Sequence, residues 1–206
     1  MEESRIDFLV DFIYESDAIE GIENDYGELR REIEDGKEAG HVGAMLWLES
    51  LMRDRSRMLN KPEICNVQKL IVETQHLKSD EQKLSSRHIG HYRDVDVFIG
   101  GRMGAHVYRI TSLMNILIYE MSNWRTEHKQ HSFEKNIVIL ADFHSIFEHI
   151  HPFVDGNGRT GRAIVYYLFR CAGIEPFIFT NADKHETYYK CFDKQRDMRK
   201  YFLKRA

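Results

Sequence analysis

The residues of this chain best suited to chemistry lie close together, in a segment over residues 151–162 that reads HPFVDGNGRTGR. His151 can accept a proton near neutral pH and act as a general base on an attacking hydroxyl. Asp155 offers a hard oxygen ligand of the kind that Mg²⁺ combines with phosphate oxygens. The segment therefore pairs a candidate base with a candidate magnesium ligand.

The glycines and arginines of the same segment indicate an anion site. Gly156 and Gly158 flank Asn157, and glycines allow backbone N–H groups to approach a ligand closely. A helix predicted to begin near Arg159 adds the N–H groups of its first turn. Arg159 and Arg162 share one face of that helix, and two guanidinium forks beside such N–H groups favour a polyphosphate over a single carboxylate.

A dinucleotide-binding fold is one competing interpretation. Gly156, Gly158 and Gly161 match the letters G-x-G-x-x-G. That motif needs a strand before it and an acidic residue about 20 positions later. Residues 137–150 have helical spacing instead, and the first acid after the segment is Glu175. The glycine spacing alone therefore does not indicate this fold.

Two further interpretations are a metal cluster and a purely structural turn. His144, His149 and His151 lie close in sequence, but their spacing matches neither H-E-x-x-H nor H-x-x-E-H. An arginine-capped glycine turn could simply join two helices. One short segment that holds a base, an acid, glycines and arginines favours a catalytic site over a metal cluster and over a structural turn.

The rest of the sequence predicts an all-α protein, a helical bundle in one domain over residues 1–206. Neither internal repeats nor a linker divide the chain, and three prolines leave room for long helices. Apolar residues recur at helical spacing around residues 6–13, 39–52, 63–71, 107–121, 137–147, 164–168 and 186–192.

A single stretch has the alternation of a strand. Val95, Val97 and Ile99 alternate with their neighbours, and Gly100 and Gly101 follow. This pattern predicts a short β-hairpin over residues 90–101, with an irregular loop as the alternative.

Composition excludes several classes of protein. The net charge of −4 gives no electrostatic reason to expect nucleic acid or an anionic membrane surface as a partner. The three cysteines form no C-x-x-C pair, so we expect reduced, buried thiols. The N-terminus is acidic, and apolar runs are too short for a membrane span. We therefore expect a cytoplasmic protein.

The segment 151–162 resembles the signature of Fic-domain proteins, His-Pro-Phe-x-Asp/Glu-Gly-Asn-Gly-Arg-x-x-Arg, with every fixed position present. The resemblance implies a helical bundle with a β-hairpin flap, and transfer of AMP from ATP to a Tyr, Thr or Ser hydroxyl of a target protein. His151 would deprotonate that hydroxyl, and Asp155 would hold Mg²⁺ against the α- and β-phosphates. The ATP-binding residues implied within the segment are Asp155, Gly156, Asn157, Gly158, Arg159, Thr160, Gly161 and Arg162.

Two other stretches resemble parts of the same family. Residues 90–101 are similar to its flap, which implies that a target segment adds as a strand to the hairpin edge. The flap residues implied to border the nucleotide are Val97, Phe98, Ile99 and Gly100. Tyr188 and Tyr189 resemble a pair that lines the adenosine pocket, with helix packing as the alternative. Arg196 stands where some members have an asparagine that contacts adenine.

The stretch from Ser16 to Gly21, SDAIEG, fits the family's inhibitory pattern Ser/Thr-x-x-x-Glu-Gly/Asn. This resemblance implies an inhibitory helix over residues 4–22, in which Glu20 competes with ATP for Arg162 and Ser16 steadies the arrangement. A helix end closed by Gly21 is the simpler interpretation.

The direction of the reaction stays open at this point. A sister branch that transfers a phosphate looks altered where Gly158, Arg159 and Arg162 are intact here, which favours AMP. Some relatives use the inhibitory glutamate to remove AMP by hydrolysis. A non-catalytic ATP sensor would have no use for His151. The expected partners are ATP and a protein target; the sequence predicts no oligomeric state.

Overall fold

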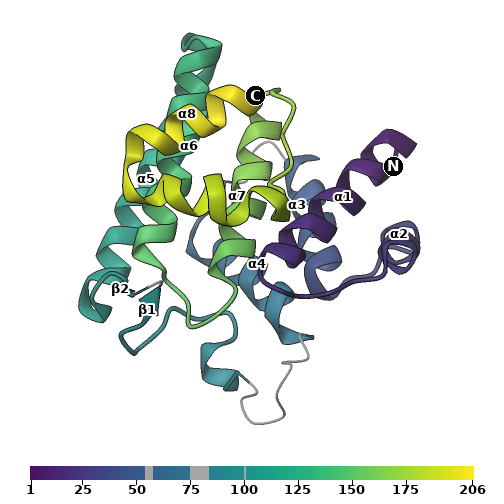
Figure 1. The fold of residues 1–206 in the computed structure, drawn as a ribbon, viewed down its shortest axis with the longest axis horizontal. Coiled ribbons are helices and arrows are strands. Elements are labelled where there is room, and N and C mark those ends of the chain that lie inside the picture. Colours follow the sequence, from purple (N-terminus) through teal and green to yellow (C-terminus); the bar gives the residue numbers. More distant parts are fainter. Residues whose placement is uncertain (54–57, 75–83, 100) are drawn as a thin grey trace.

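The computed structural model of the chain describes residues 1–53, 58–74, 84–99 and 101–206 (Figure 1). Within them the fold is a bundle of α-helices with one two-stranded sheet, as predicted. The helices are α1 (Glu3–Ile19), α2 (Tyr26–Glu34), α3 (Gly40–Arg53), α4 (Lys61–Glu73), α5 (Ile110–Glu127), α6 (Phe133–Ile150), α7 (Asn157–Cys171) and α8 (Gln195–Arg205). The strands are β1 (Phe98–Ile99) and β2 (Arg102–Met103).

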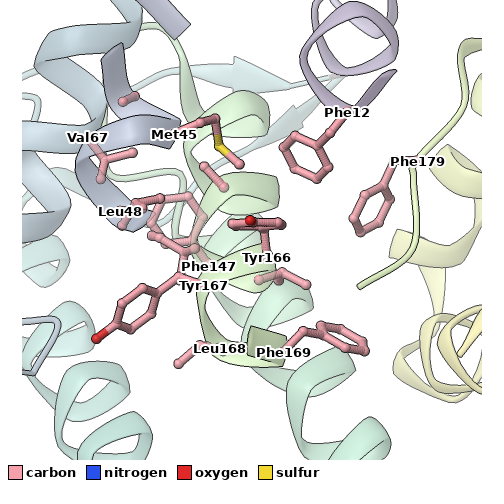
Figure 2. Packing of buried hydrophobic residues seen from close by; sticks show 14 of the residues in the cluster. Phe12, Met45, Leu48, Val67, Phe147, Tyr166, Tyr167, Leu168, Phe169 and Phe179 are labelled. Carbon is pink, nitrogen blue, oxygen red and sulfur yellow. The ribbon is translucent and has the colours of Figure 1, made fainter. Parts of the chain in front are cut away.

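Helix α7 is the centre of the bundle. It packs against α1, α3, α4 and α6, and nearly all of its residues are buried. Figure 2 shows side chains of these neighbours, among them Phe12, Met45 and Phe147, around Tyr166 and Phe169. Burial of each large apolar side chain contributes about 1.5–3 kcal/mol. The N-terminus of α7, which carries the motif, therefore stands on a firmly packed helix.

Helix α4 begins with a capping pair, Asn60 and Glu63. The Asn60 N–H donates to the Glu63 carboxylate at 3.3 Å, and Pro62 lies in the first turn. Proline fits there because its missing N–H would have no partner in the helix. The buried face of α4 then runs along the segment 151–162, where Gln68 binds the Asp155 carbonyl.

The C-terminal region differs from the expected regular helix around residues 186–192. It forms a π-helical turn, Lys184–Tyr188, followed by a 3₁₀ turn, Tyr189–Asp193, and the regular helix α8 comes later. Met198, Tyr201 and Phe202 are the buried residues of α8, a sparse pattern in a polar stretch. The apolar spacing does not predict helix α2 either, because Leu29 and Ile33 are its only buried residues.

The hairpin forms, but its paired part is shifted toward the C-terminus relative to residues 90–101. The strand pairs are Phe98 with Met103 and Ile99 with Arg102, and the Gly104 N–H donates to the Val97 carbonyl at 3.0 Å. Pairing does not start at Val95, because its carbonyl accepts a hydrogen bond from the Arg93 side chain. Gly101 takes a positive φ of 83° in the turn; Gly100 lies outside the described residues.

The described helices include none that combines the length and the apolar character needed to cross a bilayer. All three cysteines are free thiols, and Cys65 and Cys191 are buried. Burial raises the pKa of the Cys65 thiol to about 11, so this side chain is an uncharged packing residue.

Candidate active site

His151 stands at the sharp turn between α6 and the motif segment. It is the only described non-glycine residue with a positive φ, 50°, and its N–H closes α6 by donating to the Phe147 carbonyl at 2.9 Å. A left-handed conformation costs a residue with a Cβ roughly 1–2 kcal/mol. The contacts around His151 must therefore hold it there.

The surroundings of the His151 ring keep it neutral. Burial lowers the pKa of His151 to about 4. Its Nδ1 is buried and lies 3.9 Å from Oε2 of Glu148. Burial also raises the pKa of Glu148 to about 8, so this carboxyl is protonated at neutral pH and the contact is not an ion pair. His151 therefore has the protonation state of a general base, with Nε2 as the nitrogen left to take a proton.

The turn after His151 is closed by the side chain of Asn157. Its Oδ1 accepts from the Phe153 N–H and its Nδ2 donates to the Phe153 carbonyl, both at 2.9 Å. Phe153 itself is fully buried. The Asn157 side chain is thus committed to the loop, and its backbone N–H is the group that it can offer to an anion.

The anion site lies at the start of α7, two residues earlier than the sequence predicts. Gly156 precedes the helix with φ 78°. The N–H groups of Asn157 and Gly158 lie in the first turn, where a helix supplies no acceptor of its own. The Thr160 N–H donates to the Gly156 carbonyl at 2.9 Å, so Thr160 does not contribute a free donor. We call the first-turn N–H groups with the adjoining arginines the anion cradle.

Gly161 has a packing role in this arrangement. A Cβ at this position would lie 2.3 Å from Oε1 of Glu148 and 3.0 Å from the Phe147 ring. The glycine therefore lets α7 approach α6 closely, and it faces away from the cradle. Of the implied ATP-binding residues, Thr160 uses its backbone N–H within α7, and Gly161 packs against α6.

The carboxylate of Glu20 already occupies the cradle. It accepts a hydrogen bond from Nη2 of Arg162 at 2.8 Å. At Gly158, a Cβ would come within 2.4 Å of Oε1 of Glu20 and 3.0 Å of Nη1 of Arg162. Partial burial opposes ionisation of Glu20, but Arg162 outweighs it and lowers the pKa of the carboxyl. The group against the cradle is therefore an anion.

Ser16 holds the same arginine from the preceding turn of α1. Nε of Arg162 donates to Oγ of Ser16 at 2.9 Å, and Nη2 donates to the Ser16 carbonyl at 2.8 Å. Helix α1 ends at Ile19, and Gly21, with φ 75°, turns the chain away. The sequence-predicted residues Ser16 and Glu20 thus both bind Arg162, which lies 142 positions after Glu20, and Gly21 turns the chain away behind them.

A second carboxylate on α1 faces the other motif arginine, and sequence reasoning missed it. Asp17 is buried, and it lines the same cavity of about 330 Å³ as Arg159. Burial opposes ionisation of Asp17, yet His41 and Arg159 together lower its pKa. Nδ1 of His41 lies 2.8 Å from Oδ1, and Asn24 donates to Oδ2 at 2.8 Å. Asp17 therefore ties the end of α1 to α3 and to the cradle.

Asp155 is the carboxylate of the segment that could hold a magnesium ion. Its side chain is 40% exposed at the edge of the cradle, with Oδ1 3.9 Å from Nη2 of Arg159. The described residues contain no group of three His, Cys, Asp or Glu side chains that could hold a metal by themselves. A lone exposed carboxylate beside a polyphosphate cradle suits Mg²⁺, which commonly takes most of its ligands from phosphate and water.

The segment is also held by two polar residues that sequence reasoning did not single out as functional. Gln68 of α4, fully buried, donates to the Asp155 carbonyl at 3.1 Å and accepts from the Gly90 N–H at 2.6 Å. Arg93 is buried beside His151. Gln68 is a polar residue on the otherwise apolar face of the helix predicted over residues 63–71. This pattern is the signal by which the sequence could have indicated it.

The hairpin presents apolar side chains to solvent next to His151. Phe98 is 75% exposed and Met103 54%, whereas Val97 and Ile99 are less exposed. The Gly104 backbone packs against the Cβ of His151, since an added Cβ would lie 3.4 Å away. The flap edge therefore lies beside the candidate base.

The two tyrosines have different surroundings. Tyr188 is buried, and its hydroxyl lies 2.7 Å from Nε2 of His144, within an aromatic cluster that includes Phe179. Tyr189 is 38% exposed and is the one with free surface. Burial lowers the pKa of His144 to about 3, so this histidine is neutral, and the described residues place it in no group of three metal-ligating side chains.

Comparison with known proteins gives consistent results. The Fic/DOC family model matches residues 59–169, just over half of the chain. The protein adenylyltransferase Fic of Drosophila virilis is 30% identical over 190 residues, covering 86% of this chain and 36% of that protein. That of Aedes aegypti is 26% identical over 185 residues, covering 87% and 36%. The chain spans about a third of the length of these curated relatives.

Solved structures share the fold. A Fic domain containing signaling protein from Bacteroides thetaiotaomicron has a TM-score of 0.75 at 18% identity, covering 97% of this chain and 82% of that chain. Fic-1 from C. elegans has a TM-score of 0.72 at 18% identity, covering 100% and 61%. The helical bundle with a small hairpin is thus the fold of these proteins. Together with the motif over 151–162 and the family match around it, this shows that the chain belongs to the Fic/DOC family.

Proposed function

We propose that this protein transfers AMP from ATP to a Tyr, Thr or Ser hydroxyl of a target protein, and that Glu20 restrains the reaction. The observation that carries the proposal is the neutral His151 beside a cradle of helix N–H groups and two arginines. Its curated relatives bear the name protein adenylyltransferase, which supports the same reaction.

The chemical step follows from these groups. The target hydroxyl oxygen attacks the α-phosphorus, and the bond from that phosphorus to the oxygen bridging to the β-phosphate breaks. Pyrophosphate leaves, and the hydroxyl proton passes to His151. The first-turn N–H groups of α7, Arg159 and Arg162 bind the phosphates and stabilise the charge that develops on them.

Asp155 is the residue that would hold Mg²⁺. The bound ion would neutralise negative charge on the phosphates during transfer. Gln68 positions this carboxylate, because it binds the Asp155 carbonyl from the buried face of α4.

Restraint by Glu20 follows from competition for one guanidinium group. The carboxylate bound to Arg162 at 2.8 Å occupies the place where a phosphate oxygen would be bound. ATP then binds weakly, or with its α-phosphate displaced from the attacking hydroxyl. A displacement of about 1 Å is enough to lower a rate on the order of 10²-fold.

Removal of AMP by hydrolysis is the second candidate. The observation favouring it is that Glu20 is ionised and lies against Gly158, where it could orient a water toward an AMP group. We also propose the cytoplasm as the place of action, with which three free thiols agree.

The test compares wild type, Glu20→Gly and the double variant Glu20→Gly/His151→Ala with ATP labelled in the α- or the γ-phosphate. We expect α-label in protein with Glu20→Gly, much less with wild type and none with the double variant. Label from the γ-phosphate alone would mean phosphate transfer. ATP binding without labelling would favour an ATP sensor, and wild-type release of AMP from a modified protein would favour hydrolysis.

A further inference from the structure

Arg93 is buried between the base of the hairpin and the turn that carries His151. Its side chain has no exposed surface. Arginine is rarely buried in this way unless its N–H groups are satisfied. The partners of Arg93 therefore indicate what the residue holds.

On one side Arg93 binds the end of α6 and the catalytic segment. Nε donates to the His151 carbonyl at 2.7 Å, and Nη2 donates to the Ile150 carbonyl at 3.3 Å. The Arg93 backbone N–H donates to the Pro152 carbonyl at 2.8 Å. The last carbonyls of a helix lack intrahelical donors and carry partial negative charge. Arg93 thus supplies donors where α6 ends and His151 takes its left-handed conformation.

On the other side the same guanidinium group binds both arms of the hairpin. Nη1 donates to the Val95 carbonyl at 2.6 Å, before β1, and Nη2 donates to the Ala105 carbonyl, after β2. Asp96 lies 3.8 Å from Nη1 and offsets the buried charge. Its carboxylate also accepts from the Val107 N–H at 2.9 Å. The two arms are therefore tied together at their base through one side chain.

Gly104 shows how closely these parts fit. A Cβ at this position would lie 3.1 Å from Nη2 of Arg93 and 3.4 Å from Cβ of His151. A side chain at this position would therefore require the Arg93 guanidinium or the returning arm of the hairpin to shift by a few tenths of an ångström. The distance between hairpin and base is consequently defined by direct contact.

We propose that Arg93 is a positioning residue, which fixes the edge of the hairpin relative to His151. The inference rests on the proposed function. A target segment added to the hairpin edge would bring its hydroxyl to a place determined by the hairpin, while the proton acceptor is determined by the His151 turn. Because Arg93 binds both, its loss separates the hydroxyl from the base without touching ATP.

The test uses the activated Glu20→Gly protein as the parent and adds Arg93→Lys or Arg93→Ala. Lysine keeps the charge but cannot bind several carbonyls in a planar fork. We expect the kcat for AMP transfer to fall by about 10²-fold with either variant, since misplacement of about 1 Å has this effect. The Kd for ATP should change less than about twofold. Guanidinium ion added to Arg93→Ala should restore part of kcat, and ammonium ion should not.

Arg87→Lys is the matched control, because Arg87 is 65% exposed and touches neither His151 nor the strands. Gly104→Ala is a second, smaller change at the same contact and should lower kcat in the same direction. Amide exchange should increase at residues 101–105 and 150–152 in Arg93→Ala but not in the control.

The outcomes separate the two proposals. A parent that shows no transfer of AMP would refute the proposed function, and unchanged amide exchange in Arg93→Ala would refute the link between hairpin and turn. Parent-like kcat in the folded Arg93 variants would overturn the positioning role while leaving the function intact. Equal loss of kcat, ATP binding and Tm would also overturn it, in favour of general stabilisation. If Arg93→Ala does not fold, Arg93→Lys and Gly104→Ala decide.

Discussion

His151 and Glu148 lie 3.9 Å apart and have opposite pKa shifts with the same cause. Burial lowers the pKa of His151 to about 4 and raises the pKa of Glu148 to about 8. Desolvation disfavours the charged form of each, so a neutral base lies beside a neutral acid. Because the His151 ring is already neutral, it could accept a proton from a hydroxyl without first releasing one to solvent.

The first prediction concerns the pH dependence of AMP transfer. With the Glu20→Gly protein, kcat/KM should show no inflection from about pH 5.5 to 7, because His151 is already deprotonated above its pKa of about 4. Removing Glu20 lowers that pKa further, since the carboxylate favours the imidazolium. Steady-state kinetics over this range is the measurement, and an inflection near the usual histidine pKa of about 6.5 would contradict it.

The second prediction concerns Glu148 and stability. Its pKa is raised by burial from about 4.5 to about 8, so the folded state retains a proton that the unfolded state loses in this interval. The free energy of unfolding should therefore fall as pH rises from about 4.5 to 8. Glu148→Gln removes this loss, and its Tm should exceed that of wild type more at pH 8 than at pH 5. Equal differences at both pH values would show that Glu148 ionises normally.

At the scale of elements, the end of α1 presents two carboxylates to the two motif arginines. Glu20 binds Arg162 directly, and Asp17 lies in the cavity lined by Arg159. Asp17 is in turn bound by His41 of α3. The restraint that we propose would therefore depend on how firmly the whole end of α1 is docked, and not on Glu20 alone.

The third prediction follows from this docking. Asp17→Asn removes the charge that faces Arg159 and His41, and weakening of α1 docking by about 1.4 kcal/mol would raise AMP transfer about tenfold. The increase should stay below that of Glu20→Gly. Asp11→Asn on the same helix is the control, because Asp11 binds the exposed Tyr26 hydroxyl. Transfer rates of the three variants are compared, and an Asp17→Asn rate equal to wild type would refute this role.

The fourth prediction concerns the hairpin. Phe98→Pro in the Glu20→Gly protein removes a backbone N–H from the outer edge of β1, which a target strand would join, because the backbone groups of Val97 and Ile99 are turned toward β2. Modification of the target should fall by much more than ATP binding. Parallel losses of both, with a lower Tm, would instead indicate a folding defect. Transfer assays and calorimetric titration with ATP measure the two quantities separately.

At the scale of the whole molecule, α7 connects the parts of the site. Figure 1 shows it in the centre of the bundle, with α1 toward one side and the hairpin toward the other. Arg162 belongs to its buried interior, and in its first turn Asn157 is buried as well, whereas Gly158 is partly exposed. Because α7 is packed by four other helices, displacing Glu20 need not disturb the core.

The fifth prediction tests this with ligand-dependent stability. A ligand at 100 times its Kd stabilises a folded protein by about 2.7 kcal/mol. Mg²⁺-ATP should raise the Tm of Glu20→Gly clearly more than that of wild type at the same concentration, because Glu20 competes for Arg162. Thermal unfolding with and without the nucleotide provides the measurement. Equal increases would mean that Glu20 does not oppose ATP binding.

Much of the site could be predicted from sequence because its parts are contiguous. Residues 151–162 carry the base, the carboxylate, the glycines and the arginines in one short segment, and their roles depend on local turn and helix geometry. The pairing of Ser16 and Glu20 with Arg162 came from a resemblance, and the structure brings these residues together. The helical bundle followed from apolar spacing, except where buried residues are sparse, as in α2 and α8.

The residues that support the motif were decided by packing between distant elements. Asp17, Gln68, Arg93 and Glu148 come from α1, α4, the hairpin base and α6, and among them Gln68 alone has a local signal, its place on an apolar helix face. Their effects arise from burial and from hydrogen bonds to backbone groups far away in sequence. Packing between distant elements also decided the places of Tyr188 and Gly161, which are buried in the core and do not face the site. The sequence by itself therefore determines the chemistry of residues that are adjacent in the chain. The pKa values of the side chains, their positions relative to one another and their access to solvent depend on which surfaces the fold buries together.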